Sequence, residues 1–143
     1  MIGIGALVLA AASLAAPCQV PKRLNGNEAL VATLQFELKA NDLENHPIEG
    51  AQFQFLDTGV SEGQKHLLGR TAKDGTARAT LLHQWRDYFK EERNPNSGTF
   101  DIVVVAPYGA SVVRHFAIEC LKKRGEDYLV TLAVSLPNSL VIE

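Results

Sequence analysis

Short runs in which every second residue is apolar recur along the chain, and this alternation limits its fold more than any other feature. The clearest runs are residues 29–38 and 51–56. Because successive side chains of a strand point to opposite faces, such a run is typical of a strand with one buried face. Further runs span residues 66–72, 77–82, 100–106, 111–121 and 128–136, separated by Gly, Pro and Asp turn signals such as Asp74-Gly75. The pattern predicts an all-β protein, a seven-stranded antiparallel Greek-key sandwich.

The composition allows one folded domain and excludes one class of partner. Of the 143 residues, 46% are hydrophobic, which is enough to build a core. The net charge is -2, from 14 basic and 16 acidic residues. Because neither sign dominates, the sequence predicts no binding to nucleic acid.

The first seventeen residues, MIGIGALVLAAASLAAP, carry no charge. An apolar stretch followed by the small-x-small sequence Ser13-Leu14-Ala15 is typical of an export signal that is cleaved before Ala16. A retained membrane anchor is the alternative, but the stretch is shorter than the roughly 20 apolar residues that a spanning helix needs. We expect an exported protein (periplasmic, cell-surface or secreted) without a membrane span once the signal is removed. Its expected parts are a signal peptide at 1–15, an extended lead-in at 16–28 and a β-sandwich domain at 29–137.

The chain has two cysteines, Cys18 and Cys120. An even count in an exported chain favours a disulfide between them. Two alternatives stay open. Both thiols are free, or Cys18 carries a lipid, because bacterial lipoproteins are acylated on a cysteine just after the signal. Lipoprotein signals place Gly, Ala or Ser before that cysteine, whereas Pro17 stands there in this chain, so the lipid-anchored form is less favoured.

Residues 83–98 interrupt the alternation. Trp85, Tyr88 and Phe89 stand at i, i+3 and i+4, which predicts one face of a short helix over residues 84–93. A helix of about ten residues does not persist in water unless it packs against something. We favour an arrangement in which the three aromatic side chains cap the core of the sandwich. The alternative is that they are exposed and bind a partner, since Trp and Tyr dominate interface hot spots.

Three stretches resemble a known family. They are NHPIEGAQF at 45–53, GRTAKDGTA at 69–77 and FDIVVVAPYG at 100–109. They are similar to the phrases N-x-P-[IV]-x-G-A-x-[VF], G-x-T-x-x-D-G-x-A and [YF]-x-[VI]-x-[VA]-x-A-x-G of the transthyretin-like (prealbumin-like) sandwich found in carboxypeptidase regulatory-like domains. The resemblance covers roughly residues 30 to 136, and bacterial Ig-like repeats contain similar phrases. It implies a transthyretin-like or Ig-like sandwich, from which the insert at 83–98 is a departure.

Enzymes of related folds have signatures that this chain lacks. Hydroxyisourate hydrolases end in Tyr-Arg-Gly-Ser, whereas this chain ends in LPNSLVIE. Intradiol dioxygenases hold iron with two Tyr and two His, and nothing here has their spacing. The four histidines form no close pair such as HxH or HExxH, and there is no G-x-S-x-G elbow and no Gly-rich phosphate loop. We therefore predict no catalytic residue, no cofactor site and no metal site.

Taken together, these patterns predict an exported, non-catalytic module that binds a protein or a carbohydrate. The alternative is a hydrolase or a metal-binding protein of the same fold. Its ligands must converge from separate loops, and the residues that can do so are His46, His66, His83, Asp57 and Glu62. Three of these within ligand distance of one another are the observation that favours the alternative.

Overall fold

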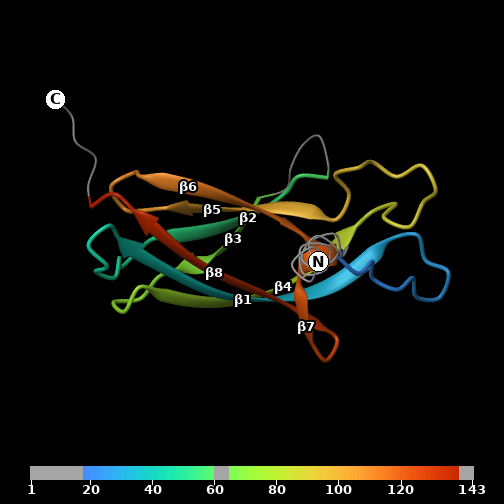
Figure 1. The fold of residues 1–143 in the computed structure, drawn as a ribbon, viewed down its shortest axis with the longest axis horizontal. Coiled ribbons are helices and arrows are strands. Elements are labelled where there is room, and N and C mark those ends of the chain that lie inside the picture. Colours follow the sequence, from blue (N-terminus) through green and yellow to red (C-terminus); the bar gives the residue numbers. More distant parts are fainter. Residues whose placement is uncertain (1–17, 60–64, 139–143) are drawn as a thin grey trace, which may run out of the picture.

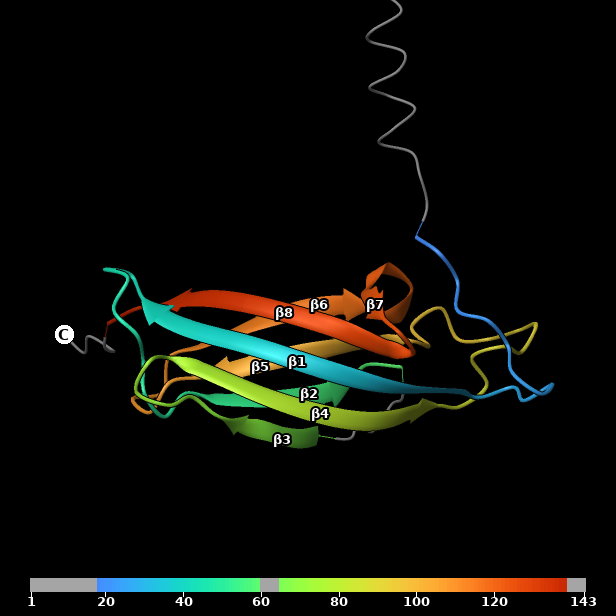
Figure 2. The same cartoon turned by 90° about the horizontal axis from the view of Figure 1, so that it is seen from below.

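The protein is an all-β sandwich of two four-stranded sheets, shown in a computed structural model that describes residues 18–59 and 65–138 (Figures 1 and 2). The expected signal peptide with its cleavage site, and Glu62, lie outside the described residues. One sheet has the order β4-β1-β8-β7 and is called the β1 sheet. Its strands are β1 (Leu30–Asp42), β4 (Thr76–Trp85), β7 (Lys122–Arg124) and β8 (Asp127–Leu136).

The second sheet has the order β3-β2-β5-β6 and is called the β5 sheet. Its strands are β2 (Gln52–Asp57), β3 (Lys65–Arg70), β5 (Thr99–Val105) and β6 (Ser111–Ala117), and a single 3₁₀ turn, η1 (Ile118–Cys120), follows β6. The β3–β4 connection, which includes Asp74-Gly75, crosses from one sheet to the other. Gly75 has a φ of 79°, and a Cβ there would lie 2.6 Å from the carbonyl oxygen of Ala40, so this tight crossing requires glycine.

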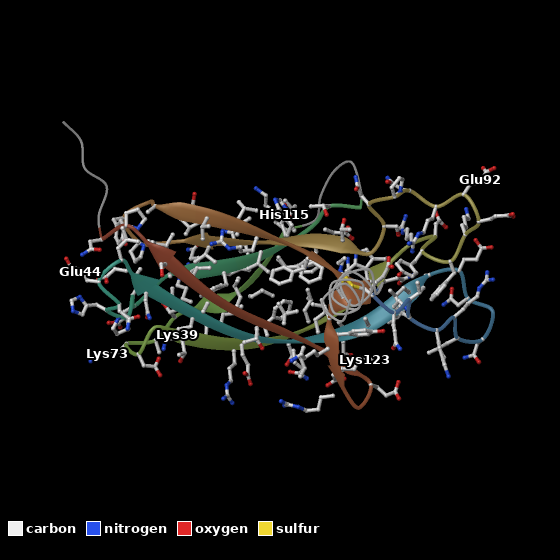
Figure 3. All side chains as sticks on the ribbon, viewed as in Figure 1. Lys39, Glu44, Lys73, Glu92, His115 and Lys123 are labelled. Atoms are coloured by element: carbon white, nitrogen blue, oxygen red, sulfur yellow. A yellow bond between two sulfur atoms is a disulfide. The ribbon has the colours of Figure 1, made fainter. Side chains whose placement is uncertain are left out.

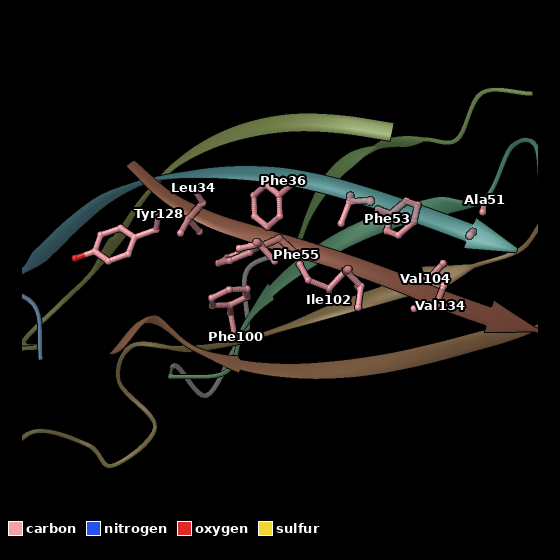
Figure 4. Close-up of a cluster of buried hydrophobic side chains, with 14 of the residues drawn as sticks. Leu34, Phe36, Ala51, Phe53, Phe55, Phe100, Ile102, Val104, Tyr128 and Val134 are labelled. Atoms are coloured by element: carbon pink, nitrogen blue, oxygen red, sulfur yellow. The ribbon is translucent and has the colours of Figure 1, made fainter. Parts of the chain in front are cut away.

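The core lies between the sheets and consists of the inward residues of each alternating run (Figure 4). The prediction that Phe36, Phe53, Phe55, Ile102 and Val104 belong to it is confirmed, since all five are buried. Phe55 stacks on Phe100 with 5.0 Å between the ring centroids and meets Phe36 edge-on at 6.4 Å. The Phe55–Phe100 contact lies within the β5 sheet, between β2 and β5, whereas the Phe36–Phe55 contact joins the two sheets across the sandwich.

The sandwich differs from the predicted one in strand number and in strand direction. The described residues form eight strands, because the segment predicted to be a charged turn forms a hairpin in which Lys122 pairs with Leu129 and Arg124 with Asp127. In addition, β1 pairs with β8 in parallel, whereas every strand pair was predicted to be antiparallel. No hairpin joins these two distant strands, so no local turn signal fixes their relative direction.

The predicted helix over 84–93 is wrong. β4 continues through Trp85, which pairs with Leu30 of β1, and turns follow it. Asp87 has a φ of 59°, a left-handed value that a right-handed helix does not tolerate. The amide of Phe89 donates to the carbonyl of Glu28 instead of to a helical partner. Inward His83 and Trp85 continue the two-residue period of β4, so the helical spacing of the aromatic residues was coincidental.

Within residues 18–59 and 65–138, no helix reaches the length and apolarity that a membrane crossing requires.

Candidate functional site: Asp–His pairs and a basic groove

Three of the four histidines lie against an aspartate, at three separate places on the molecule. His46 lies 3.5 Å from Asp42 at a loop after β1. His115 of β6 is hydrogen-bonded to Asp101 of β5 on the outer face of the β5 sheet (Figure 3). His83 of β4 is hydrogen-bonded to Asp57 of β2, inside the sandwich. The fourth, His66 of β3, has its ring 6.1 Å from the ring of His83.

The Asp57–His83 pair is buried and joins the two sheets. The Nε2 atom of His83 lies 2.6 Å from Oδ2 of Asp57, and the side chains are only 6% and 5% exposed. The other carboxylate oxygen, Oδ1, accepts a 2.7 Å hydrogen bond from the amide of Gly59. Around the imidazole, the rings of Phe55 and Trp85 lie at 4.8 and 4.6 Å. Both carboxylate oxygens therefore have protein partners within an aromatic cage.

This pair does not extend into a metal site among residues 18–59 and 65–138, where no group of three His, Cys, Asp or Glu side chains could hold an ion. His46, which was considered as a ligand together with His66 and His83, lies at a different loop. The geometry instead supports a structural role, in which the pair holds the two sheets together. A buried carboxylate is tolerated where its oxygens accept hydrogen bonds, as those of Asp57 do from His83 and Gly59.

The aromatic residues of the insert are directed into the protein. Trp85 and Tyr88 are buried, and Phe89 is half-buried. Arg93 lies over the Tyr88 ring at 4.3 Å and makes a 3.1 Å ion pair with Glu119. Burial raises the pKa of the Tyr88 hydroxyl above its ordinary value. In this conformation Trp85 and Tyr88 present no surface to a partner, and the insert is fastened to the η1 segment.

A disulfide joins Cys18 to Cys120, whose Cα atoms are 4.9 Å apart. It fastens the extended lead-in to the end of η1, next to β7 (Figure 2). The hydrogen bonds of Arg23 and Leu24 run to Asn27 and so stay within the lead-in. Among the described residues, the disulfide is thus the covalent link between the first part of the lead-in and the sandwich.

The lead-in forms one wall of a groove of roughly 990 Å³, which we call the basic groove. The opposite wall is the β7–β8 hairpin, and the start of β1 lies between the two walls. Lys22, Lys122 and Lys123 line it, together with two acidic residues, of which Glu119 is already paired with Arg93. Its apolar lining is Val20, Pro21, Leu24, Leu30, Val31, Leu121 and Tyr128.

A row of four side chains, three of them apolar, crosses the outer face of the β5 sheet. The strand registers place Leu67, Gln54, Val103 and Val113 side by side across all four strands. Leu67 and Val113 are 54% and 42% exposed. The neighbouring rows add Leu56 and Val105 among polar and charged residues. We call the three apolar residues of the central row, Leu67, Val103 and Val113, the apolar row; Gln54 lies between Leu67 and Val103.

Sequence reasoning missed the meeting of Asp57 with His83, although a signal was present. The inward positions of residues 77–82 are the odd-numbered ones, and extending that period by two steps places His83 and Trp85 on the same inward face. The apolar row was missed because it requires the registers of three strand pairs. No single run of sequence contains this information.

Comparisons with known proteins yield distant structural likenesses only. No family model matches the chain, and no curated protein matches it. The dioxygenase domain of a dioxygenase carbohydrate-binding protein fusion from Streptomyces sp. SirexAA-E is similar with a TM-score of 0.47 and 12% identity, over 85% of this chain and 97% of that one. Catechol 1,2 dioxygenase of Acinetobacter radioresistens has a TM-score of 0.44 and 16% identity, over 79% of this chain and 56% of that one. Such values carry no argument about family or function.

Proposed function

We propose that the protein is an exported, non-catalytic β-sandwich module that binds another protein through the outer face of its β5 sheet. The observation that carries the proposal is the apolar row. Monomeric proteins rarely expose large apolar patches, and such patches rimmed by polar residues mark interaction sites. Leu67 and Val113 are exposed on this face, and Val103 and the polar Gln54 lie between them in the row. Aliphatic side chains favour a protein partner over the carbohydrate that the sequence also allowed.

The proposed relationship to transthyretin-like domains, with their Greek-key order of strands, rests on where the three resembling stretches lie. The first leads into β2, the second contains the β3–β4 crossing at Asp74-Gly75, and the third includes β5. In the family phrases these positions are also a strand entry, a turn and a central strand. Export rests on the apolar segment before Cys18 and on the disulfide, because disulfides persist in oxidising compartments.

The alternative function, hydrolysis or metal binding, is less well supported. Among residues 18–59 and 65–138, the pair that suits such a centre is Asp57 and His83, whose side chains meet inside the fold. The hydrogen bonds from Gly59 and His83 occupy both Asp57 oxygens, which supports a structural role.

Chemical crosslinking in the exported fraction tests the proposal. We expect the wild-type protein to capture a defined partner, and the double variant Leu67→Arg/Val113→Arg to lose it while keeping its melting temperature. Leu82→Arg is the matched control, because Leu82 is 68% exposed but lies in β4, in the other sheet. Equal capture by all three proteins, or by none, contradicts the proposal. Intact-mass analysis of the same fraction tests export, with the mature chain expected to begin at Ala16.

A further inference from the structure

We propose that the basic groove binds an anionic amphiphile, namely a single hydrocarbon chain ending in a carboxylate, and that the Cys18–Cys120 disulfide assembles this site. The groove lies away from the apolar row of the β5 sheet, so the inference goes beyond the proposed protein partner. It rests on three observations: the charges that line the groove, the apolar character of its walls, and the way in which the lead-in is held.

The charge of the groove is opposite to that of the whole chain. Three lysines line it, whereas the protein as a whole has a net charge of -2. The ammonium of Lys123 lies 5.0 Å from the ring centroid of Tyr128, next to the apolar lining. Of the two acidic residues, Glu119 is paired with Arg93, so the three lysines of the lining outnumber the remaining acidic residue, Glu126. A local excess of positive charge at the edge of an apolar surface complements an anionic head group.

The apolar lining complements a hydrocarbon tail. Val20 and Leu24 of the lead-in are exposed on one wall, and Leu121 belongs to the other. The volume of roughly 990 Å³ lies at the upper end of the range that small-molecule sites occupy. A chain lying here removes apolar surface from water on both walls, which is the favourable term in its binding.

The polar lining favours an amphiphile over a peptide. A bound peptide brings backbone amides and carbonyls that need hydrogen-bond partners along their whole length. Among the side chains of the lining, only the charged residues, the phenol of Tyr128 and the amide of Gln19 can form hydrogen bonds. A hydrocarbon chain brings no such groups. The groove also has walls on two sides, which suits one molecule better than the flat surface of a membrane.

The disulfide makes the site conditional on oxidation. The wall formed by Gln19–Leu24 is attached to the sandwich through Cys18, and the hydrogen bonds of Arg23 and Leu24 stay within the lead-in. Reduction therefore releases this wall while the strands keep their pairing. The site is complete only in an oxidising compartment, where such a disulfide persists.

Titration calorimetry with sodium laurate, below the concentration at which it forms micelles, tests the proposal. We expect saturable binding of one laurate per protein. Methyl laurate, acetate and dodecyltrimethylammonium should each bind at least about tenfold more weakly, because each lacks the charge, lacks the tail or reverses the charge. Equal binding of laurate and methyl laurate overturns the role of the lysines.

Variants locate the site. Lys122→Gln/Lys123→Gln should weaken laurate binding by about tenfold or more, the effect of losing one charge-assisted hydrogen bond. The matched control is Lys39→Gln/Lys73→Gln, which removes two lysines that lie far from Lys123 (Figure 3). Equal affinities of these two variants refute the site. Binding to phosphatidylglycerol vesicles without binding of laurate indicates a membrane-facing surface instead and also refutes it.

A second pair of variants tests the assembly by the disulfide. Cys18→Ser/Cys120→Ser, and the wild type under dithiothreitol, should both lose laurate binding. Because loss of the disulfide also affects stability, Val20→Ser/Leu24→Ser provides an independent test: it alters the same wall at exposed positions. It should weaken binding while the melting temperature stays within about a degree of wild type, since exposed substitutions change stability little. Full binding by the reduced protein and by this variant contradicts the proposal.

Discussion

Two Asp–His pairs of this protein have the same chemistry and opposite surroundings. Asp57 and His83 are almost fully buried and join β2 of one sheet to β4 of the other. Asp101 and His115 face each other on neighbouring strands of a single sheet, and the His115 side chain is 80% exposed. The first pair lies among aromatic rings, whereas in the second the His115 imidazole lies in water and the Asp101 side chain is 13% exposed. The same two residue types can therefore form contacts that we expect to contribute differently to the stability of the fold.

The physical reason is the cost of removing charge from water. A buried pair stabilises the fold only if hydrogen bonds compensate for lost hydration, and deleting one partner leaves the other buried without compensation. An exposed pair gains little, because water and salt screen both charges. We therefore expect the two pairs to respond differently to the same substitution, and the following predictions test that expectation.

The largest expected effect is that of Asp57→Ala. It should lower the free energy of unfolding by about 3–5 kcal/mol, the cost of breaking a buried pair. The substitution leaves the Nε2 atom of His83 and the amide of Gly59 without their acceptor. Urea denaturation followed by tryptophan fluorescence measures the change, since Trp85, the single tryptophan of the chain, lies against His83.

The control for that variant is the double replacement Asp57→Leu/His83→Leu. Apolar residues of similar volume remove both hydrogen-bonding partners together, so it should be clearly more stable than Asp57→Ala. If Asp57→Ala itself costs less than about 1 kcal/mol, burial does not distinguish this pair from Asp101–His115.

The next largest effect is expected for Trp85→Ala. Trp85 is buried and forms one side of the aromatic cage around His83, so its removal leaves a cavity and lets water approach the pair. We expect a loss of about 3 kcal/mol. Thermal unfolding followed by circular dichroism measures it. An unchanged melting temperature contradicts the structural role of Trp85. It favours the alternative in which the aromatic residues of the insert bind a partner.

The sequence predicted the structural features that depend on neighbouring residues. It did not predict the features that depend on contacts between residues far apart in the chain. Alternation alone located the inward residues of β1, β2 and β5, because the two-residue period is a local property. It did not reveal that β1 pairs in parallel with β8, nor that Asp57 meets His83 across 26 residues of chain. The insert failed for a related reason. Trp85 fits both the two-residue period of β4 and the helical spacing that it shares with Tyr88 and Phe89. Its pairing with β1 places it in the strand.

A smaller effect is expected for the exposed pair. Asp101→Ala should change the free energy of unfolding by no more than about 1 kcal/mol, because His115 stays hydrated when its partner is removed. The measurement is the same urea denaturation, at low and at high salt. A loss as large as that of Asp57→Ala means that burial is not the source of the difference between the two pairs.

The smallest effect concerns the third pair, Asp42–His46, in which the His46 side chain is 69% and the Asp42 side chain 15% exposed, and it is an effect on the pH dependence of stability. The backbone amide of His46 donates to the Asp42 carboxylate at 2.9 Å, with a further bond from the amide of Glu44, and these bonds lower the pKa of Asp42 below 3.8. A carboxyl whose pKa is depressed by folding contributes stability above its unfolded pKa, and the contribution is lost as the pH falls through the folded value. We therefore expect Asp42→Asn to have a shallower decline in melting temperature below about pH 4 than the wild type. Carbon-detected NMR titration of the Asp42 carboxyl provides the direct measurement, and a pKa at or above 3.8 contradicts the prediction.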